Sequence, residues 1–362
     1  MTDTTAGRHT VFRWIGRHRV LVIYLCIGAV VLATAVALFN QALAHPDGGQ
    51  ADAAGQGGFG AAPGATGSAV PTVSATPSTG ASRTPKPPVV PPSRSGFPDA
   101  TNTGVPAGTA LTTYSGPCTI TTANTVIDAK TVNCNLTIRA KGVLIKRSKI
   151  NGNMGTVEDT PYSYTLQDSE VDAGLYQGAA LGSTNMTVLR SNIHGGQTSI
   201  YCFSNCTIRD SWLHGQRIAA GSDWHLGAFL ANDNGHDPGG RTNALLVHNT
   251  IVCDSPATNV DGGCSGDINL YGDFGPILSV TLDHNLFGAN TDLSYCVYGG
   301  STPQKPYSGQ AASIVVINNV FKRGSNRSCG AYGPVTGFDK ARPGNQWSNN
   351  VWDDGSPVGP AM

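Results

Sequence analysis

One short pattern recurs along most of this chain of 362 residues. Each copy has an alternating apolar stretch, then Ser or Asn as an anchor, then any residue and an apolar residue. The anchors are Ser148, Ser169, Ser191, Ser211, Asn249, Asn285, Asn319 and Asn350. They lie about 20 residues apart at first and about 35 apart later, as in stacked repeat units. Each unit alternates with period two and is too short for a strand plus a helix, so the pattern predicts stacked β-coils. The longer late steps fit the same coil with a loop inserted on one side.

The composition agrees with such a β-structure. Glutamate occurs only as Glu158 and Glu170, whereas Gly reaches 46 residues. Since only 13% of residues are charged, the chain has too few of the charged residues that usually cover the exposed faces of a helical bundle. Plentiful Asn, Asp, Gly, Thr and Ser favour short strands joined by turns. The 23 basic and 23 acidic side chains cancel, which argues against nucleic acid as a partner.

An apolar run without a charge occupies residues 20–39. As a helix it spans about 30 Å, the thickness of a bilayer core. Four arginines precede the run, and no Lys or Arg follows it before Arg83. The positive-inside rule therefore predicts a cytoplasmic basic tail over 1–19, a transmembrane signal-anchor and an extracellular remainder. The alternative is a signal peptide cleaved after Ala44, which would make the protein secreted, although the run is longer than a typical signal peptide.

The segment 45–95 is rich in Gly, Ala, Pro, Ser and Thr, with almost no large apolar residue. Such a composition cannot bury enough surface to offset its ordering entropy, so we expect a disordered linker. Its Pro-rich end, around TPKPPVVPPS, is expected to be stiffer than its first half. The repeat-bearing domain then occupies 96–362.

Eight cysteines follow the apolar run, an even number that indicates disulfides in an exported domain. Sequential pairing closes a local loop at each bridge and is the simplest of the 105 connectivities. It predicts the pairs Cys118–Cys134, Cys202–Cys206, Cys253–Cys264 and Cys296–Cys329. A zinc site is the competing interpretation, but no C-x2-C pair and no His at ligand spacing supports it.

The coils resemble a known family. The turns Asn185-Met186-Thr187-Val188 and Asn205-Cys206-Thr207-Ile208, together with the DHNLFG and NNVFKRG segments, are similar to right-handed parallel β-helix proteins of the pectate-lyase-like superfamily. The likeness is greatest to secreted or membrane-anchored β-helix proteins of high-GC Gram-positive bacteria. It implies an all-β solenoid over the repeat-bearing domain. It implies no single function, because that superfamily includes lyases, glycoside hydrolases, epimerases and non-catalytic adhesins. The ordered motifs of its pectin hydrolases do not occur here.

Stacking turns each position of the repeat into a column along the solenoid. The anchors are expected to point inward at a turn, where they can hydrogen-bond up and down the stack. The residues just before the anchors alternate in charge over the first coils, a pattern that favours pairing between neighbouring coils. We interpret that column as structural; it comprises Arg147, Asp168, Arg190, Asp210, His248, His284 and Asn318.

The column three residues after the anchor is the candidate functional site. It begins Asn151, Asp172, His194, His214 and is expected to face solvent. The longest interruption, GSDWHLGAFLANDNGHDPGGR, follows directly and adds carboxylates, imidazoles, an Arg and a Trp. The catalytic candidates are Asp172, His194, His214, Asp223, His225 and Arg241. The carbohydrate-binding candidates are Trp212, Trp224, Asp233, His236 and Asp237. Aromatic faces can stack on sugar rings while charged groups bind uronates or move protons. The competing interpretation is a Gly/Asp-rich surface loop beside a turn ladder.

Three functions remain open from the sequence. The first is a surface-anchored β-helix that binds or degrades polysaccharide or cell-wall glycan. As a lyase it would use Arg241 or a His as base; as a hydrolase it would use two of Asp172, Asp223, Asp233 and Asp237. Ca²⁺ is a candidate ion for these acids, although no EF-hand or nonapeptide pattern is present. The second function is a non-catalytic structural or adhesion module. The third is an envelope sensor that uses the basic tail.

Overall fold

The computed structural model describes residues 96–157, 160–232, 241–254 and 263–360. These residues form an all-β structure with one short 3₁₀ helix, η1 (Ser308–Gln310). Within this part of the chain, no helix is long and apolar enough to cross a membrane. The predicted tail, membrane span and linker all lie outside the described residues, so they stay predictions.

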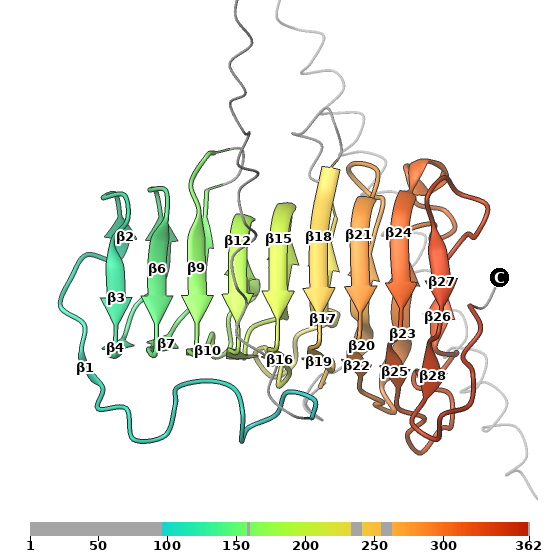
Figure 1. The fold of residues 1–362 in the computed structure, drawn as a ribbon, viewed down its shortest axis with the longest axis horizontal. Coiled ribbons are helices and arrows are strands. Elements are labelled where there is room, and N and C mark those ends of the chain that lie inside the picture. Colours follow the sequence, from blue (N-terminus) through green and yellow to red (C-terminus); the bar gives the residue numbers. More distant parts are fainter. Residues whose placement is uncertain (1–95, 158–159, 233–240, 255–262, 361–362) are drawn as a thin grey trace, which may run out of the picture. The chain divides into compact units, whose positions relative to one another are not determined.

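The described strands are short and parallel, and they form three sheets (Figure 1). Sheet A contains, in spatial order, β1 (Thr112–Thr113), β4 (Lys130–Val132), β7 (Lys149–Asn151), β10 (Glu170–Asp172), β13 (Asn192–His194), β16 (Trp212–Leu213), β19 (Thr250–Ile251), β22 (Leu286–Phe287), β25 (Val320–Phe321) and β28 (Val351–Trp352). Sheet B contains β2 (Thr119–Ile120), β5 (Leu136–Ile138), β8 (Met154–Thr156), β11 (Ala179–Gly182), β14 (Thr198–Cys202), β17 (Leu226–Ala231), β20 (Cys264–Leu270), β23 (Leu293–Gly299) and β26 (Val335–Thr336). Sheet C contains β3 (Val126–Asp128), β6 (Val143–Lys146), β9 (Tyr164–Gln167), β12 (Thr184–Leu189), β15 (Ser204–Arg209), β18 (Arg241–Val247), β21 (Leu278–Asp283), β24 (Ala312–Ile317) and β27 (Gln346–Ser348).

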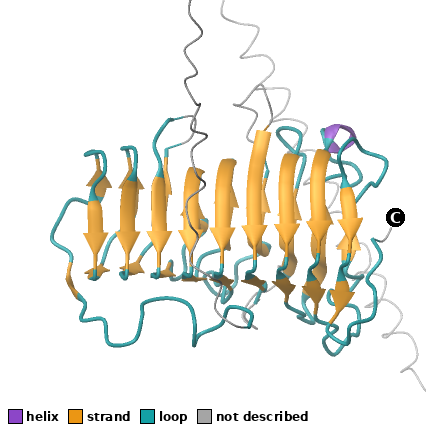
Figure 2. Cartoon of the chain, in the orientation of Figure 1, coloured by secondary structure: helices purple, strands orange, loops and turns teal. Residues whose placement is uncertain are grey.

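The chain visits the sheets in a fixed order, from C to A to B, and each circuit makes one coil. The strands β12, β13 and β14 form one coil, and each pairs in parallel with its counterpart β15, β16 or β17 in the next. Successive coils therefore stack about 4.8 Å apart along the axis. Figure 2 shows the stacked coils as a row of arrows. This stack of parallel strands confirms the predicted β-coils and has the architecture of a parallel β-helix.

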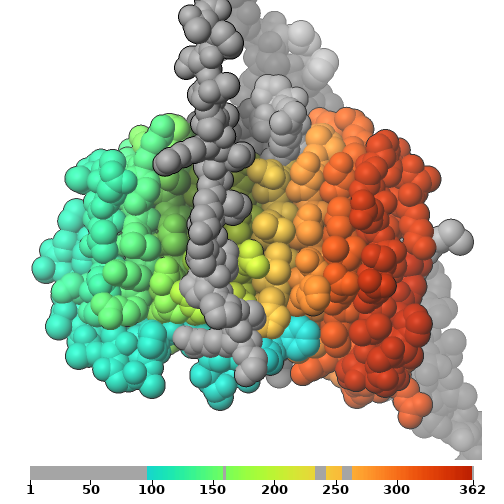
Figure 3. Space-filling view, in the orientation of Figure 1, coloured from blue at the N-terminus to red at the C-terminus, as the bar shows by residue number. Residues whose placement is uncertain are grey.

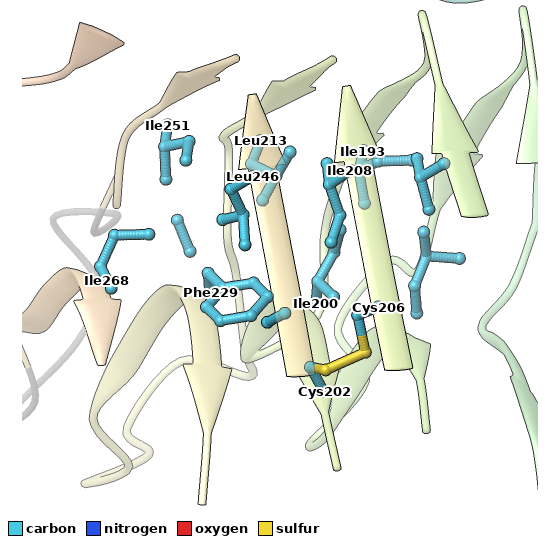
Figure 4. Close-up of a cluster of buried hydrophobic side chains, with 14 of the residues drawn as sticks. Ile193, Ile200, Cys202, Cys206, Ile208, Leu213, Phe229, Leu246, Ile251 and Ile268 are labelled. Atoms are coloured by element: carbon cyan, nitrogen blue, oxygen red, sulfur yellow. A yellow bond between two sulfur atoms is a disulfide. The ribbon is translucent and has the colours of Figure 1, made fainter. Parts of the chain in front are cut away.

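The core is built from columns of inward-facing apolar side chains. In sheet A, one residue per strand points inward and pairs with the same position in the next coil. This column contains Ile193, Leu213, Ile251, Phe287 and Phe321, all with no exposed surface. Figure 4 shows its first members packed against side chains from sheets B and C. Parallel sheets closed on one another in this way leave the chain no long unpaired edge along its flanks.

The anchors form a buried hydrogen-bonded ladder at the turn from sheet C to sheet A. The backbone N–H of Ser211 donates to Asn249 Oδ1 at 2.9 Å, and that of Asn249 donates to Asn285 Oδ1 at 3.0 Å. The Asn285 N–H donates in turn to Asn319 Oδ1 at 2.8 Å. The amide groups also donate to the preceding coil, as from Asn319 Nδ2 to Leu282 O at 2.9 Å. The predicted inward ladder is confirmed.

The column before the anchors allows the sharp turn. Its residues, like the equivalent residues of the flanking coils, adopt left-handed backbone angles, with φ between 47° and 59°, so the chain turns from sheet C to sheet A within two residues. Their side chains pair between neighbouring coils. Arg190 Nε and Nη2 donate hydrogen bonds to the two carboxylate oxygens of Asp168, at 2.7 and 2.9 Å. His248 Nδ1 lies 2.6 Å from Asp210 Oδ1. These pairs agree with the structural interpretation of the column.

All four predicted disulfides are present: Cys118–Cys134, Cys202–Cys206, Cys253–Cys264 and Cys296–Cys329. Each joins positions that the coil brings together. The second bridge, for example, links the last residue of β14 to β15 across the corner between sheets B and C. The sequential pairing is therefore confirmed, and its bridges staple neighbouring strands rather than distant parts of the chain.

Insertions are confined to the two borders of sheet B. From β6 onward, two residues connect sheet C to sheet A in every coil. The connections into and out of sheet B vary in length, from the single residue between β14 and β15 to the long connections between β16 and β17 or between β23 and β24. The predicted one-sided insertion of loops is therefore correct in outline, and the loops border the outer face of sheet B.

Replacing Asn319 with Ala should cost about 3 kcal/mol of unfolding free energy. The change leaves the buried Asn285 N–H and the Leu282 carbonyl without their partners, at about 1–3 kcal/mol each. The measurement is urea unfolding of residues 96–362, which contain the whole described core. Asn326→Ala, at an exposed turn, is the control and should change stability little. Equal stabilities of the two variants would contradict the ladder's role.

Candidate functional site

The predicted column lies on the outer face of sheet A. Asn151 pairs in register with Asp172, and Asp172 with His194. The His194 and His214 rings lie 5.5 Å apart, so the column continues into the next coil. The structure therefore brings three of the six predicted catalytic residues together, and they are half-buried rather than exposed.

Glu170, two residues before Asp172 on β10, also belongs to this cluster. Its Oε1 lies 3.1 Å from His194 Nε2 and 2.9 Å from Lys149 Nζ. The hydrogen bond with His194 and the ion pair with Lys149 outweigh partial burial and lower the pKa of Glu170 to about 2. The carboxyl is thus ionised at neutral pH and has two cationic or donor partners. The sequence could have pointed to Glu170, because it is one of only two glutamates in the chain.

Asp172 is also held in an ionised state. Arg217 Nη2 lies 2.6 Å from Asp172 Oδ1, and the Gly174 N–H donates to the same oxygen at 2.9 Å. Burial raises the pKa of Asp172, but the Gly174 amide, His194 and Arg217 together outweigh it and leave the pKa below its usual range. Neither carboxyl of the cluster is therefore a proton donor at neutral pH, which a glycosidase acid has to be.

His214 is held neutral beside an aromatic ring. Its imidazole stacks on Trp212 with ring centroids 3.4 Å apart. Nε2 lies 2.7 Å from Asn192 Oδ1, a carbonyl oxygen, so this nitrogen is the donor. Burial, with the nearby His194, lowers the pKa of His214 to about 4. The cluster is therefore a network of satisfied pairs on sheet A, with its charges facing one another.

The predicted loop residues do not join this cluster in the described part of the chain. Asp223, Trp224 and His225 are exposed on the connection between β16 and β17. That connection lies on the border of sheet B, where the Gln197 side chain donates to the His225 carbonyl. Arg241 begins β18, and its side chain is outside the described set. Asp233, His236 and Asp237 also lie outside the described residues, so their roles stay predictions.

A groove that the sequence did not reveal lies on the outer face of sheet B. It encloses about 350 Å³. Its floor is the outward column of β8 and β11, where Gly155 pairs with Gly182. A Cβ on Gly155 would lie 2.6 Å from the Gly182 carbonyl oxygen, so the bare backbone is what makes the hollow. Tyr176, Tyr201 and Phe203 line it, and the Tyr201 and Phe203 rings lie 4.3 Å apart.

The polar groups of this groove are uncharged. Its lining comprises Asn135, Leu136, Thr137, Asn153, Met154, Gly155, Thr156, Tyr176, Gly178, Ala179, Gly182, Ser183, Tyr201 and Phe203. Asn153 Oδ1 is buried and has no hydrogen-bond partner among the described residues. A hollow with aromatic walls, neutral donors and acceptors and an unsatisfied carbonyl is suited to a neutral, hydroxyl-rich ligand.

Exposed aromatic side chains gather along the same face. Among the described residues, the exposed ones are Tyr176 (44%), Trp224 (46%), Phe274 (56%) and Tyr332 (75%). All four belong to connections that enter or leave sheet B. Three of them lie on connections from sheet A to sheet B, and Phe274 lies on a connection from sheet B to sheet C. We call these residues, which follow the stacked coils along the two borders of sheet B, the aromatic row. The predicted sugar-binding residue Trp224 belongs to this row, whereas Trp212 lies on sheet A.

A second aromatic group continues the row near the C-terminal coils. The Tyr271 and Tyr298 rings lie 5.1 Å apart, edge to face, and Tyr295 lies 5.4 Å from Tyr298. Lys305 Nζ lies 5.0 Å from the centroid of the Tyr271 ring and 2.8 Å from Asp273 Oδ1. Tyr201 and Tyr298 belong to one outward column of sheet B. Both halves of sheet B thus present aromatic side chains outward.

One group of potential metal ligands comes together among the described residues. Ligand atoms of Asp267, Cys296 and Cys329 lie within 4.8 Å of one another. The two sulfurs form a disulfide, which leaves no thiolate to bind a metal. Asp267 is fully buried, and burial raises its pKa well above the usual range. The group therefore fits a neutral buried acid beside a disulfide; the Ca²⁺ prediction for the loop acids stays untested.

Comparisons with protein-family profiles, with curated proteins and with solved structures find no match for this chain. The proposal for its function therefore rests on the geometry of the coil and on the side chains of its outer faces.

Below neutral pH, protonation of His214 should destabilise the fold. Because the pKa of His214 is about 4 in the folded chain against 6.5 ordinarily, the unfolded chain takes up the proton first. Stability that is complete above pH 6.5 is thus lost progressively down to about pH 4. His214→Gln should lose less stability than wild type over this interval in urea unfolding. His225→Gln is the control and should follow wild type; equal slopes for all three proteins would refute the assignment.

Proposed function

We propose that this protein is an exported parallel β-helix that binds a polysaccharide chain along the outer face of sheet B. The observation that carries the proposal is the uncharged, aromatic-walled groove over Gly155 and Gly182, continued by exposed aromatic residues on both borders of that sheet. Aromatic faces stack on sugar rings, and the neutral amides and hydroxyls of the groove match sugar hydroxyls.

The arrangement favours a chain molecule over a small ligand. The aromatic row follows the solenoid from Tyr176 to Tyr332, and each coil adds about 4.8 Å along the axis. A polymer can contact several such side chains at once, so weak contacts add up along its length. A single sugar would contact only one part of the row.

The chemistry of the groove favours a neutral glycan. Every described side chain that lines it is uncharged, whereas a uronate carboxylate would call for Arg, Lys or a bound cation. Lys305, beside Tyr271, is paired with Asp273. Recognition by stacking and by neutral hydrogen bonds is therefore the proposed mode.

We propose binding without cleavage as the primary activity. Asp172 of the predicted catalytic column and its neighbour Glu170 are ionised and ion-paired on sheet A, away from the groove on sheet B. A hydrolase requires a protonated acid and a second carboxylate on either side of the scissile bond. The non-catalytic adhesion or structural module is thus the form of the function that the geometry supports best.

Location and kinship are part of the same proposal. The charge-free run over 20–39 supports a single membrane anchor with the coil outside the cell. Four disulfides suit an oxidising compartment. The likeness of the coil motifs supports right-handed winding and kinship with the pectate-lyase-like superfamily. A signal peptide cleaved after Ala44 would give the same binding face on a secreted protein.

Filling the groove should weaken glycan binding about tenfold. Gly182→Ala adds a methyl group that meets only the Tyr201 carbonyl oxygen, at 3.7 Å, so the fold accepts it while the hollow shrinks. Tyr176→Ala removes an exposed stacking surface and should have a similar effect, since about 1.4 kcal/mol corresponds to a factor of ten. The affinity of residues 96–362 for neutral and uronate-containing polysaccharides is the measurement.

Trp212→Ala serves as the control for the other face and should leave the affinity unchanged. If Trp212→Ala alone abolishes binding, the site belongs to sheet A and the proposal fails. New reducing ends that disappear in His214→Ala or Asp223→Ala would establish an enzyme in place of a binding module. Absence of binding across the whole panel by the folded domain would also refute the proposal.

A further inference from the structure

The first described residues form a strap across sheet A; we call residues 96–111 the strap. Its C-terminal end leads into β1, which pairs with β4. Farther back, the Gly104 N–H donates to the Arg190 carbonyl at 3.1 Å, beside β13. The Phe97 ring stacks on His248 with centroids 5.6 Å apart, beside β19. Followed toward the N-terminus, the strap thus runs from the first coil toward the last, as the cyan segment in Figure 3 shows.

The outer face of sheet A changes character where the strap ends. One outward column runs through Lys149, Glu170 and Asn192 in the early coils, all polar. The same column then continues through all later strands of the sheet as the apolar stripe, which comprises Trp212, Thr250, Leu286, Val320 and Val351. These five side chains are half-buried. The polar half lies beside the strap, whereas only the first part of the apolar stripe does.

A cavity of about 360 Å³ opens where the strap meets this stripe. It is lined by Phe97, Pro98, Asp99, Trp212, Thr250, Val252, Leu286, Gly288, Ala289 and Lys322. Thr250 Oγ1 is buried and has no hydrogen-bond partner among the described residues. The cavity thus offers mostly apolar walls, with Asp99 and Lys322 also in its lining, and one buried hydroxyl. This is a good match for a proline-rich chain, whose carbonyls are not used internally.

We propose that the proline-rich segment 86–95 continues the strap through this cavity and along the apolar stripe. Its sequence, KPPVVPPSRS, directly precedes Gly96 and contains the apolar run Val89-Val90-Pro91-Pro92. Prolines lock the chain near an extended conformation, so docking costs little entropy. Thr250 Oγ1 would donate to a backbone carbonyl of the segment.

The length of the segment fits the stripe. The strap uses about 15 residues to cross six strand spacings, or about 29 Å at about 4.8 Å each. At that pace, the three spacings from β19 to β28 take about seven or eight residues. Counted back from Phe97, this places Pro92 near Val320 and Val89 and Val90 near Val351. The most apolar part of the segment thus meets the most apolar part of the face.

Docking would also orient the protein. It would fix the point at which the linker leaves the coil, at β28 rather than beside β19. Sheet B would be unobstructed, because the docked segment covers only sheet A. The inference therefore stands independently of whether sheet B binds polysaccharide.

Site-specific photocrosslinking in the full-length protein tests this docking. A p-benzoylphenylalanine in place of Val90 should cross-link, within one chain, to peptides that contain Val320 or Val351, as identified by mass spectrometry. The same probe in place of Val70, earlier in the linker, should not reach these peptides. Val320→Asp should lower the cross-link yield at least fivefold because it places a charge on the stripe. Val126→Asp, on sheet C and already exposed, is the matched control and should leave the yield unchanged.

Several outcomes would overturn the inference. Cross-links from position 90 to sheet B or sheet C would place the segment on another face. Cross-links between two chains would show that the stripe is a contact between copies. A folded protein without cross-links to the stripe would show that the segment does not dock there.

Discussion

The structure depends on the hydrogen-bonded turn between sheets C and A. In each of these coils a left-handed residue turns the chain from sheet C to sheet A, and the next residue, Ser or Asn, is hydrogen-bonded to the equivalent residue of the following coil. Because every anchor has to meet its neighbour about 4.8 Å away, this turn cannot lengthen without leaving buried amides unsatisfied. Insertions are therefore confined to the connections around sheet B. The short turn between sheets C and A thus restricts the loops of variable length, and the exposed aromatic side chains that they carry, to the borders of sheet B.

The three faces of the coil carry different chemistry as a result. On the early half of sheet A, Lys149 is ion-paired with Glu170 and Arg217 with Asp172, while His194 is hydrogen-bonded to Glu170; these contacts keep both acids ionised. The groups in each pair neutralise one another across neighbouring strands, so little charge is left to attract a ligand. Sheet B has the opposite character, because its hollow is uncharged and contains the unpartnered Asn153 Oδ1. The groove on sheet B, where a buried polar group lacks a partner, is therefore a better candidate for ligand binding than the paired charges on sheet A.

Much of the fold was predictable from the repeat alone. The anchors, the period of two and the sequential disulfides are local features, so their spacing predicts the coil, the ladder and all four bridges. The column Asp172, His194 and His214 was predictable for the same reason, since equal positions in successive coils become neighbours. The groove was not predictable: Gly155 and Gly182 matter only because both point outward in adjacent strands, and Tyr176 lies in a connection outside the repeat. The loop acids at Asp233 and Asp237 lie outside the described residues, so the sequence prediction for them is untested.

Hydrogen–deuterium exchange of the full-length protein, with and without a neutral polysaccharide, is the most direct test of glycan binding on sheet B. The account predicts slower exchange in peptides that contain β8, β11 and β14, with no change in peptides that contain β13, β16 and β19. Bound polymer covers the first set and leaves the exchange of the second set unchanged. Protection confined to β13 and β16, around His194 and Trp212, would contradict the account and return the site to the column on sheet A.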